Sequence, residues 1–398
     1  MNLVKIAVIG QGYVGLPISI AACSAGFSVL GIDIDTNKIQ KLVNGESGIE
    51  DIDDKSLKNY ISAGKFEPTS SYEKIHECKI ILICVPTPLT SEKQPDLTAV
   101  VNSIKEISKY FLNDSLIIVE STVGPGTTRD LLLPLLEEYS GKTRNDFHLA
   151  FSPERIDPRN KLWNLSNTPK LVAGLSANAG IIAKDFYEKF IDEVVLVDSL
   201  EVAETAKLLE NSFRLVNISF INELSIFCSK LGIDINNVIE AASTKPYGFM
   251  PFYPSIGVGG HCIPVDPIYL ATKAKEIGSP TEFIDLASRI NHEMPGYFVD
   301  RAELIIGNLN NKRVLVVGVS YKPNVADVRE TPVKELIKGL LNKGANVSWH
   351  DELVKKWEGC ESVALSSDYD LAILATPHDG VDLSKLGNTP ILNTRGSI

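Results

Sequence analysis

The feature that most constrains this chain is a glycine-rich turn between a short apolar run and a helical segment near the N-terminus. Residues 4–9 are mostly β-branched and apolar, as expected of a buried parallel strand, and residues 10–15 read Gly-Gln-Gly-Tyr-Val-Gly. A second apolar run ends at Asp33. A strand, a Gly-x-Gly-x-x-Gly turn, a helix and an acidic residue after the next strand predict a dinucleotide-binding βαβ unit.

Each of the three glycines of this turn has a physical role. Gly10 permits the tight turn, Gly12 lets a pyrophosphate approach the backbone, and Gly15 lets the helix pack closely on the strand. Asp33 would accept hydrogen bonds from the adenosine ribose, and its charge, together with that of Asp35, would repel a 2′-phosphate. We therefore predict NAD rather than NADP; a glycine turn without a ligand is the alternative.

Strand and helix patterns alternate along the rest of the chain. Strands are expected at 29–33, 79–85, 115–120 and 147–151, helices around 98–111 and 127–139, and a strand, a helix and a strand within 171–198. One long apolar helix, 201–231, and a helix at 234–243 follow, and a second α/β unit starts at 313, with strands at 313–319, 346–350 and 371–375 and a helix at 331–343. The predicted fold class is α/β, with two Rossmann-like doubly wound domains joined by a long central helix. The predicted boundaries are 1–199, 200–300 and 301–398.

Composition narrows the class of protein. The net charge of −11 over 398 residues argues against nucleic acid and against an anionic membrane surface as partners. We see no apolar stretch long enough to span a membrane and no signal-peptide pattern. The six cysteines are scattered without Cys-x-x-Cys pairs, so neither a disulfide framework nor a metal site is predicted, and a cytoplasmic location fits best.

A glycine-rich loop at residues 257–266 carries the most chemistry. Cys262 lies there beside His261, with Asp266 four residues further on, and the glycines would let a substrate approach the backbone. The residues alone leave two interpretations open: a nucleophilic cysteine, or an incidental thiol in a structural loop.

The long helix supplies possible partners for this loop. Lys207 and Asn211 are four residues apart and share one helix face. Such side chains in an apolar helix are costly unless they are paired or functional. Lys207 could stabilise an oxyanion or act as a base; a structural salt bridge, for example to Glu204, is the alternative.

Two segments end predicted strands at the edge of the sheet where ligands bind. These are residues 120–127, which include Thr122, and Ser-Pro-Glu-Arg at 152–155. Glu154 is a candidate general base at this edge, and its alternative role is a helix cap or an ion pair.

The chain resembles the UDP-glucose/GDP-mannose dehydrogenase family over nearly its full length. The residues that carry the resemblance are the N-terminal glycine turn, Pro86-Thr87-Pro88, Ser121-Thr122-Val123, Ser152-Pro153-Glu154-Arg155, Lys207 with Asn211, Gly259-Gly260-His261-Cys262, Gly318-Val319-Ser320-Tyr321-Lys322 and Asp327-Val328-Arg329-Glu330. One departure is His350-Asp351-Glu352, which stands where the family often has Asp-Pro.

The resemblance implies roles for individual residues. Cys262 would be the nucleophile, with Lys207, Asn211 and Asp266 assisting, Thr122 placing a water and Glu154 aiding thioester hydrolysis. The cofactor-binding set would be Gly10, Gly12, Tyr13, Val14, Gly15, Asp33, Lys38, Thr87, Thr122 and Arg329. The substrate-binding set would be Glu154, Arg155, Lys207, Asn211, Lys245, Tyr253, Gly259 and Lys322, the last of these on the nucleotide phosphates. The long helix would form a homodimer or a higher homo-oligomer.

The implied reaction is the two-step oxidation of a primary alcohol of a UDP-sugar to a carboxylate. Residues 243–254, residues 152–158 and His261 resemble the branch of the family that acts on UDP-N-acetylglucosamine. UDP-N-acetylmannosamine and UDP-glucose are the alternative substrates. Alternatives of another class are a single-step hydroxy-acid dehydrogenase, which needs no cysteine, and a non-catalytic NAD-binding regulator.

Overall fold

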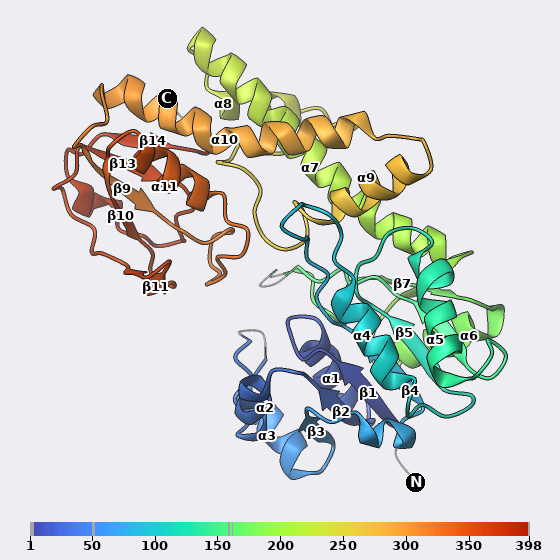
Figure 1. Cartoon of the computed structure of the whole chain (residues 1–398). Helices are drawn as coiled ribbons and strands as arrows, with labels where there is room; N and C mark the ends of the chain where they lie inside the picture. The colour runs from blue at the N-terminus through green and yellow to red at the C-terminus, as the bar shows by residue number, and fades with distance from the viewer. Residues whose placement is uncertain (1–3, 50–51, 158–159, 161, 397–398) are drawn as a thin grey trace. The chain divides into compact units, whose positions relative to one another are not determined.

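A computed structural model describes residues 4–49, 52–157, 160 and 162–396; Pro158, the last residue of the segment 152–158, lies outside them. The chain divides into two compact units, Met1–Leu209 and Glu210–Ile398, and each is described by itself. The helix α7 (Leu200–Leu231) begins in the first unit and ends in the second, which confirms the long helix expected at 201–231 (Figure 1). No helix in the described part of the chain is long and apolar enough to cross a membrane.

The first unit is built on an eight-stranded sheet of order β3-β2-β1-β4-β5-β6-β7-β8. Its strands are β1 Lys5–Ile9, β2 Ser28–Ile32, β3 Phe66–Thr69, β4 Ile80–Ile83, β5 Leu116–Val119, β6 His148–Phe151, β7 Lys170–Gly174 and β8 Val194–Leu196. All pairs are parallel except β6 with β7. The order of the first six strands is that of the dinucleotide-binding fold, whose strand order reverses between β1 and β4.

Helices cover both faces of this sheet. Ala7 and Ile9 of β1 enter one apolar core, and Ile6 and Val8 enter the other, because successive side chains of a strand point to opposite faces. The helical elements are α1 Gly15–Ser24, α2 Thr36–Val43, α3 Asp54–Ser62, η1 Glu73–Glu77, α4 Thr98–Ile107, η2 Thr128–Leu132, α5 Leu133–Ser140 and α6 Ala177–Tyr187. The predicted doubly wound architecture is confirmed.

The second unit has a smaller parallel sheet of order β10-β9-β13-β14. Its elements are α8 Ile235–Ser243, α9 Asp266–Glu276, α10 Glu282–Ile306, β9 Arg313–Val317, α11 Val333–Asn342, β10 Asn346–His350, β11 Lys356–Trp357, β12 Cys360–Glu361, β13 Leu371–Leu374, η3 Leu383–Leu386 and β14 Ile391–Asn393. Side chains of α10 and α11 pack on one face of this sheet, and a smaller cluster that includes η3 covers the other.

The helices α2, α3, α9 and α10 are not among those predicted from the sequence. The helix α10 continues through Pro295, a residue that lacks a backbone N–H and commonly ends a helix. Pro295 is buried there together with Met294 and Phe298, so tertiary packing outweighs the local preference. A pattern read along the chain alone does not include this contribution.

Candidate active site

The glycine turn after β1 has the geometry of a dinucleotide site. Gly10 has φ +90°, and a Cβ there would lie 2.5 Å from the carbonyl oxygen of Cys84. A Cβ on Gly15 would lie 1.8 Å from the Gly10 oxygen. A Cβ on Gly12 would meet nothing within 4 Å. Packing therefore requires Gly10 and Gly15, whereas Gly12 leaves open backbone that a pyrophosphate could approach.

Asp33 and Lys38, both predicted to hold the adenosine ribose, lie together at the end of β2. The Asp33 carboxylate accepts hydrogen bonds from the Gln11 N–H at 2.8 Å and from Lys38 Nζ at 2.7 Å. Of the other predicted cofactor residues, Tyr13 is exposed beside the turn and Thr87 is buried. Open backbone at a helix N-terminus with a carboxylate after the next strand fits NAD.

Lys207 of α7 forms an ion pair with Glu154, at 3.5 Å between Nζ and Oε2. Both side chains are largely buried, and Glu154 also accepts a hydrogen bond from the Ile156 N–H. The structure thus brings together two predicted catalytic residues. The alternative role of Lys207, a salt bridge, is therefore present, but with Glu154 and not with Glu204, whose carboxylate accepts hydrogen bonds from Gly126 and Thr128.

Glu204 holds the loop that carries Thr122. Its fully buried carboxylate accepts hydrogen bonds from the N–H groups of Gly126, at 2.6 Å, and Thr128, at 2.9 Å. Burial raises the pKa of Glu204 to about 7, although these hydrogen bonds act in the opposite direction. Glu204 stands three residues before Lys207 on the same side of α7, and this spacing is the feature of the sequence that could have indicated that Glu204 belongs to the site.

A buried network joins the two loops that carry Thr122 and Glu154. Lys170 Nζ lies 2.8 Å from the Glu120 carboxylate and 3.3 Å from the Pro153 carbonyl oxygen, and the Tyr187 hydroxyl donates to Glu120. Glu120 stands two residues before Thr122, and Pro153 directly precedes Glu154. Lys170 is not among the residues predicted from the sequence, although a lysine at the start of an apolar strand must be paired when it is buried.

The second unit brings Cys262, Asp266 and Asn211 together. The Cys262 carbonyl oxygen accepts hydrogen bonds from the N–H groups of Val265, at 3.2 Å, and Asp266, at 2.8 Å, where α9 begins. The buried Asp266 carboxylate accepts a hydrogen bond from Asn211 Nδ2 at 2.6 Å. The exposed cysteine therefore lies at the start of a helix whose first residue is hydrogen-bonded to α7.

Exposure separates Cys262 from most other cysteines of the chain. Burial raises the pKa of Cys23 and of Cys78 to about 12, and raises the pKa of Cys84 well above its usual value. These three groups remain protonated and inert at neutral pH. Of the two exposed cysteines, Cys262 and Cys360, only Cys262 has predicted catalytic residues around it.

His261 does not supply a positive charge to the neighbouring thiol. Burial lowers the pKa of His261, and the charge of Arg329 lowers it further, so the imidazole is neutral at neutral pH. Arg329, a predicted cofactor residue, forms an ion pair with Asp327 in this unit, at 2.6 Å between Nη2 and Oδ2.

The glycines before Cys262 are required by the packing of the chain itself. A Cβ on Gly259 would lie 2.6 Å from the Glu330 carbonyl oxygen, and one on Gly260 would lie 2.8 Å from the Tyr321 ring. Gly260 also has φ +84°. The approach of a substrate to this backbone stays a prediction, and the structure adds a second reason for the glycines, which is that their lack of side chains makes room for Tyr321 and Glu330.

The predicted sugar-binding segment is mostly exposed. Tyr247 is 73% exposed and Tyr253 is 54% exposed, and Lys245 Nζ lies 5.0 Å from the centre of the Tyr247 ring. Phe252 instead packs against Phe213 of α7, with ring centres 5.8 Å apart. Phe252 therefore has a packing role against α7, whereas the Tyr247 ring remains exposed.

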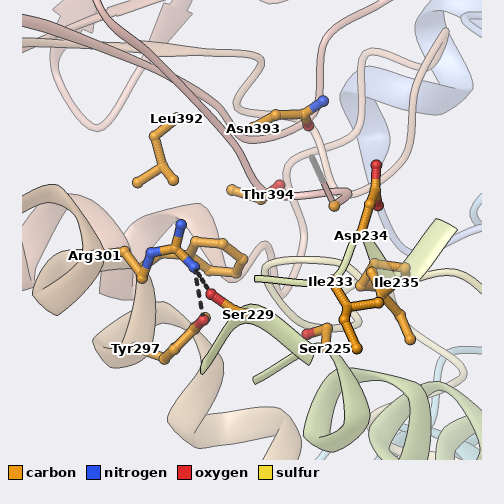
Figure 2. Close-up of a pocket in the computed structure, with 13 residues that line it drawn as sticks. Ser225, Ser229, Ile233, Asp234, Ile235, Tyr297, Arg301, Leu392, Asn393 and Thr394 are labelled. Atoms are coloured by element: carbon orange, nitrogen blue, oxygen red, sulfur yellow. Dashed lines mark hydrogen bonds between the residues drawn. The ribbon is translucent and has the colours of Figure 1, made fainter. Parts of the chain in front are cut away.

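A small pocket of about 40 Å³ lies elsewhere in the second unit and contains no predicted site residue. Figure 2 shows the Arg301 guanidinium there, donating to the Tyr297 hydroxyl at 3.0 Å and to the Ser229 hydroxyl. Arg301 belongs to α10 and Ser229 to α7, so this hydrogen bond joins the two helices.

Three family descriptions match successive parts of the chain. They are the NAD binding domain of the UDP-glucose/GDP-mannose dehydrogenase family at residues 4–191, its central domain at 201–293 and its UDP binding domain at 315–395. The UDP-N-acetyl-D-glucosamine 6-dehydrogenase of Salmonella typhi is 36% identical over 388 residues, which cover 94% of this chain and 90% of that protein.

Solved structures agree with this match. The UDP-D-ManNAc dehydrogenase from Pyrococcus horikoshii has a TM-score of 0.89 at 31% identity, covering 98% of this chain and 95% of that one. A UDP-glucose dehydrogenase from Pyrobaculum islandicum has a TM-score of 0.91 at 25% identity, covering 99% and 94%. From its glycine turn to its last strand, the chain belongs to the UDP-glucose/GDP-mannose dehydrogenase family and carries that family's NAD-binding domain.

Proposed function

We propose that this protein is an NAD-dependent UDP-sugar 6-dehydrogenase that oxidises a primary alcohol to a carboxylate through a thioester on Cys262. The observation that carries the proposal is the exposed Cys262 at the start of α9, where Asn211 is hydrogen-bonded to the buried Asp266. An exposed thiol beside polar groups of this kind suits covalent catalysis, whereas a buried thiol does not.

The glycine turn and Asp33 would hold NAD, which would supply the hydride acceptor, and NADH would be exchanged for a second NAD between the two oxidations. In the first oxidation, the alcohol would give its hydroxyl proton to Lys207 as the base and its hydride to the cofactor, and would become an aldehyde. The Cys262 thiolate then adds to the aldehyde carbon and forms a tetrahedral thiohemiacetal, and the loss of a second hydride leaves a thioester. Lys207 and Asn211 would donate hydrogen bonds to the oxyanion of these steps. Water then attacks the thioester, the thiolate departs, and the carboxylate forms.

The hydrolytic step needs a group that orients and deprotonates water. We assign this work to Glu154, with Thr122 and Asp266 assisting. In support, Glu154 is already paired with Lys207 at 3.5 Å, so its carboxylate is held in a fixed place. The loop of Thr122 is fixed in turn by Glu204 and through Glu120.

For the substrate we propose UDP-N-acetylglucosamine. The 36% identity to the Salmonella typhi enzyme favours it, and the exposed aromatic rings at 247–253 could contact a sugar or an acetyl methyl group. UDP-N-acetylmannosamine differs at one stereocentre and is the nearest rival. The similarity to the Pyrococcus horikoshii structure keeps that rival open.

The experiment is an assay of the purified protein with NAD and each of three substrates: UDP-N-acetylglucosamine, UDP-N-acetylmannosamine and UDP-glucose. We expect two NADH for each sugar nucleotide consumed, and the highest kcat/KM with UDP-N-acetylglucosamine. One NADH per substrate with free aldehyde as product would indicate a single-step dehydrogenase. NAD binding without reduction by any of these substrates would favour a regulator.

We also propose that α7 forms the interface of a homodimer. In this proposal the chain has three domains, at residues 1–199, 200–300 and 301–398. Exposed apolar side chains recur along α7 at spacings of four and seven, which suits the pairing of two helices: Leu209, Phe213, Phe220, Phe227 and Leu231. Phe220→Glu should yield a monomer by light scattering. Leu304→Glu on α10, where an apolar side chain is even more exposed, is the control and should remain a dimer.

A further inference from the structure

The segment 319–324 of the second unit contains Lys322, which we assign to the nucleotide phosphates. Its first residues are held by the carboxylate of Asp351, which follows β10. The Val319 N–H lies 2.9 Å from Asp351 Oδ2, and the Ser320 hydroxyl lies 3.3 Å from the same oxygen. The start of the segment is therefore tied to the end of a neighbouring strand of the sheet.

The other end of the segment is held by His378. The Asn324 N–H donates to His378 Nδ1 at 2.8 Å, and His378 Nε2 lies 2.8 Å from Asp351 Oδ1. A backbone N–H can only donate, so Nδ1 must accept, and the ring proton of the neutral imidazole is on Nε2, where it donates to Asp351. The side chain of Asn324 also exchanges two hydrogen bonds with Asp379.

His378 and Asp351 are both buried, and their polar side-chain atoms all have hydrogen-bond partners. His378 is 6% exposed and Asp351 is 1% exposed. Asp351 also accepts hydrogen bonds from the N–H groups of Leu353 and Val354. Burial alone would raise the pKa of Asp351, but the hydrogen bonds from His378 and from the backbone outweigh it and hold that pKa well below its usual range. A buried network in which every group has a partner has one preferred geometry.

The same segment also contacts the loop of the nucleophile. The Tyr321 ring occupies the space above Gly260, two residues before Cys262. The Tyr321 N–H donates to the Asp327 carbonyl oxygen at 2.9 Å, which fastens the segment to the turn that carries Arg329. A shift of residues 319–324 would therefore move Lys322 and the wall of the Cys262 loop together.

We infer that Asp351 and His378 are a positioning pair that presets the segment 319–324, and with it Lys322, for the nucleotide part of the substrate. The inference rests on the proposed function and adds two residues that act through the segment rather than on the substrate. Neither residue belongs to the sets of catalytic and binding residues that the sequence predicts.

The test measures the binding of UDP alone by calorimetry to the intact protein and to three variants. His378→Ala removes both hydrogen bonds of the imidazole. His378→Gln keeps an oxygen that can accept from the Asn324 N–H and an amide that can donate to Asp351. The control is His350→Gln: His350 directly precedes Asp351, but its Nδ1 lies 2.6 Å from the Val363 carbonyl oxygen, and it is not hydrogen-bonded to the segment.

We expect His378→Ala to weaken UDP binding about tenfold or more, since a tenfold change corresponds to the loss of about one buried hydrogen bond. NAD affinity should change much less, because the glycine turn, Asp33 and Lys38 lie in the first unit and Arg329 is the one predicted cofactor residue in the second. His378→Gln should recover most of the UDP affinity, and His350→Gln should bind as the wild type does. In turnover, the KM for the sugar nucleotide should rise more than kcat falls. If His378→Ala does not fold, His378→Asn, which is too short to reach both partners, replaces it.

The possible failures are distinguishable. A wild-type protein that binds no UDP overturns the proposed substrate class and the inference together. Wild-type affinity for UDP in the Ala or Asn variant overturns the inference alone. Equal losses of UDP and NAD affinity, or the same loss of UDP affinity in His350→Gln, would mean that the pair only stabilises the fold, and would also overturn it.

Discussion

The parallel sheets of the two units begin in the same way along the chain, but the residues that follow differ. The first strand of each sheet, β1 or β9, is followed by a glycine with positive φ, +90° at Gly10 and +84° at Gly318. The N–H of each glycine donates to the last carbonyl of the neighbouring strand, at 2.7 and 2.8 Å. An acidic residue follows that neighbouring strand in both units, Asp33 in the first and Asp351 in the second.

The units differ in the segment that comes after this glycine. In the first unit α1 begins at Gly15, so a helix N-terminus lies beside the turn, and Asp33 makes its ion pair with Lys38. In the second unit α11 begins only at Val333, and Asp351 holds the inserted segment together with His378. Both carboxylates accept a hydrogen bond from the N–H of the residue after the glycine, but in addition Asp33 pairs with a lysine at the place proposed for the cofactor, whereas Asp351 pairs with the buried His378. The same topology therefore surrounds an equivalent carboxylate with different partners in the two units.

The largest effect that separates the units should come from Cys262→Ala in the second unit. Without the thiol no thioester forms, so production of the carboxylate should fall by about 10³-fold or more. NAD binding, assigned to the first unit, should remain at the wild-type level. Product analysis with an NAD titration decides this, and uronate formed at near wild-type rate would make Cys262 a structural residue.

Two alanine substitutions separate the packing role of Gly15 from the cofactor-binding role proposed for Gly12. Gly15→Ala places a Cβ 1.8 Å from the Gly10 oxygen, so it should destabilise the first unit by roughly 1–3 kcal/mol or more and lower the melting temperature. Gly12→Ala meets nothing within 4 Å, so it should leave the melting temperature unchanged but weaken NAD binding. Wild-type NAD affinity in Gly12→Ala would refute a pyrophosphate at this position.

Asp33→Asn and Asp351→Asn make the same change at equivalent places. Asp33→Asn should weaken NAD binding by about 1.5–3 kcal/mol, the value of a charge-assisted hydrogen bond, and should narrow the preference over NADP. Asp351→Asn should weaken UDP binding instead and change NAD binding much less. Calorimetry with both ligands checks this, and a loss of NAD affinity in Asp351→Asn as large as its loss of UDP affinity would contradict the separate roles of the two carboxylates.

The fold could be predicted from the sequence wherever the local pattern of residues agrees with the tertiary packing. Site residues could be predicted where they directly follow a predicted strand or lie in a glycine-rich segment. Asp33 and the glycine turn could be predicted because their motif is continuous along the chain, and Lys38 was implied by the family resemblance. Glu204, Lys170 and His378 were not assigned these roles, because their partners lie 17 to 78 residues away in the chain. Periodicity carries no information about such contacts, which exist only after the sheet has formed.

The smallest predicted effect is a dependence of folding stability on pH. Rising pH should lower the contribution of Glu204 in the first unit and raise that of Asp351 in the second. The folded-state pKa of Glu204 is raised from 4.5 to about 7, so the folded protein holds this proton more tightly than the unfolded chain does. The corresponding stability is fully present below pH 4.5 and is lost as the pH rises through about 7. Asp351 has a lowered pKa, so its contribution is present at neutral pH and is lost on acidification below its unfolded value.

Glu204→Gln isolates the contribution of Glu204 to the pH dependence of stability, because the amide has nearly the shape of the carboxyl group and does not titrate. Between about pH 5 and 8 the melting temperature of the wild type should fall by a few degrees more than that of the variant. Asp351→Asn should leave this difference unchanged, because the Asp351 term acts only in acid. Parallel curves for the wild type and Glu204→Gln would mean that the Gly126 and Thr128 N–H groups keep Glu204 ionised throughout. The loop of Thr122 would then be held with equal strength at every pH in that range.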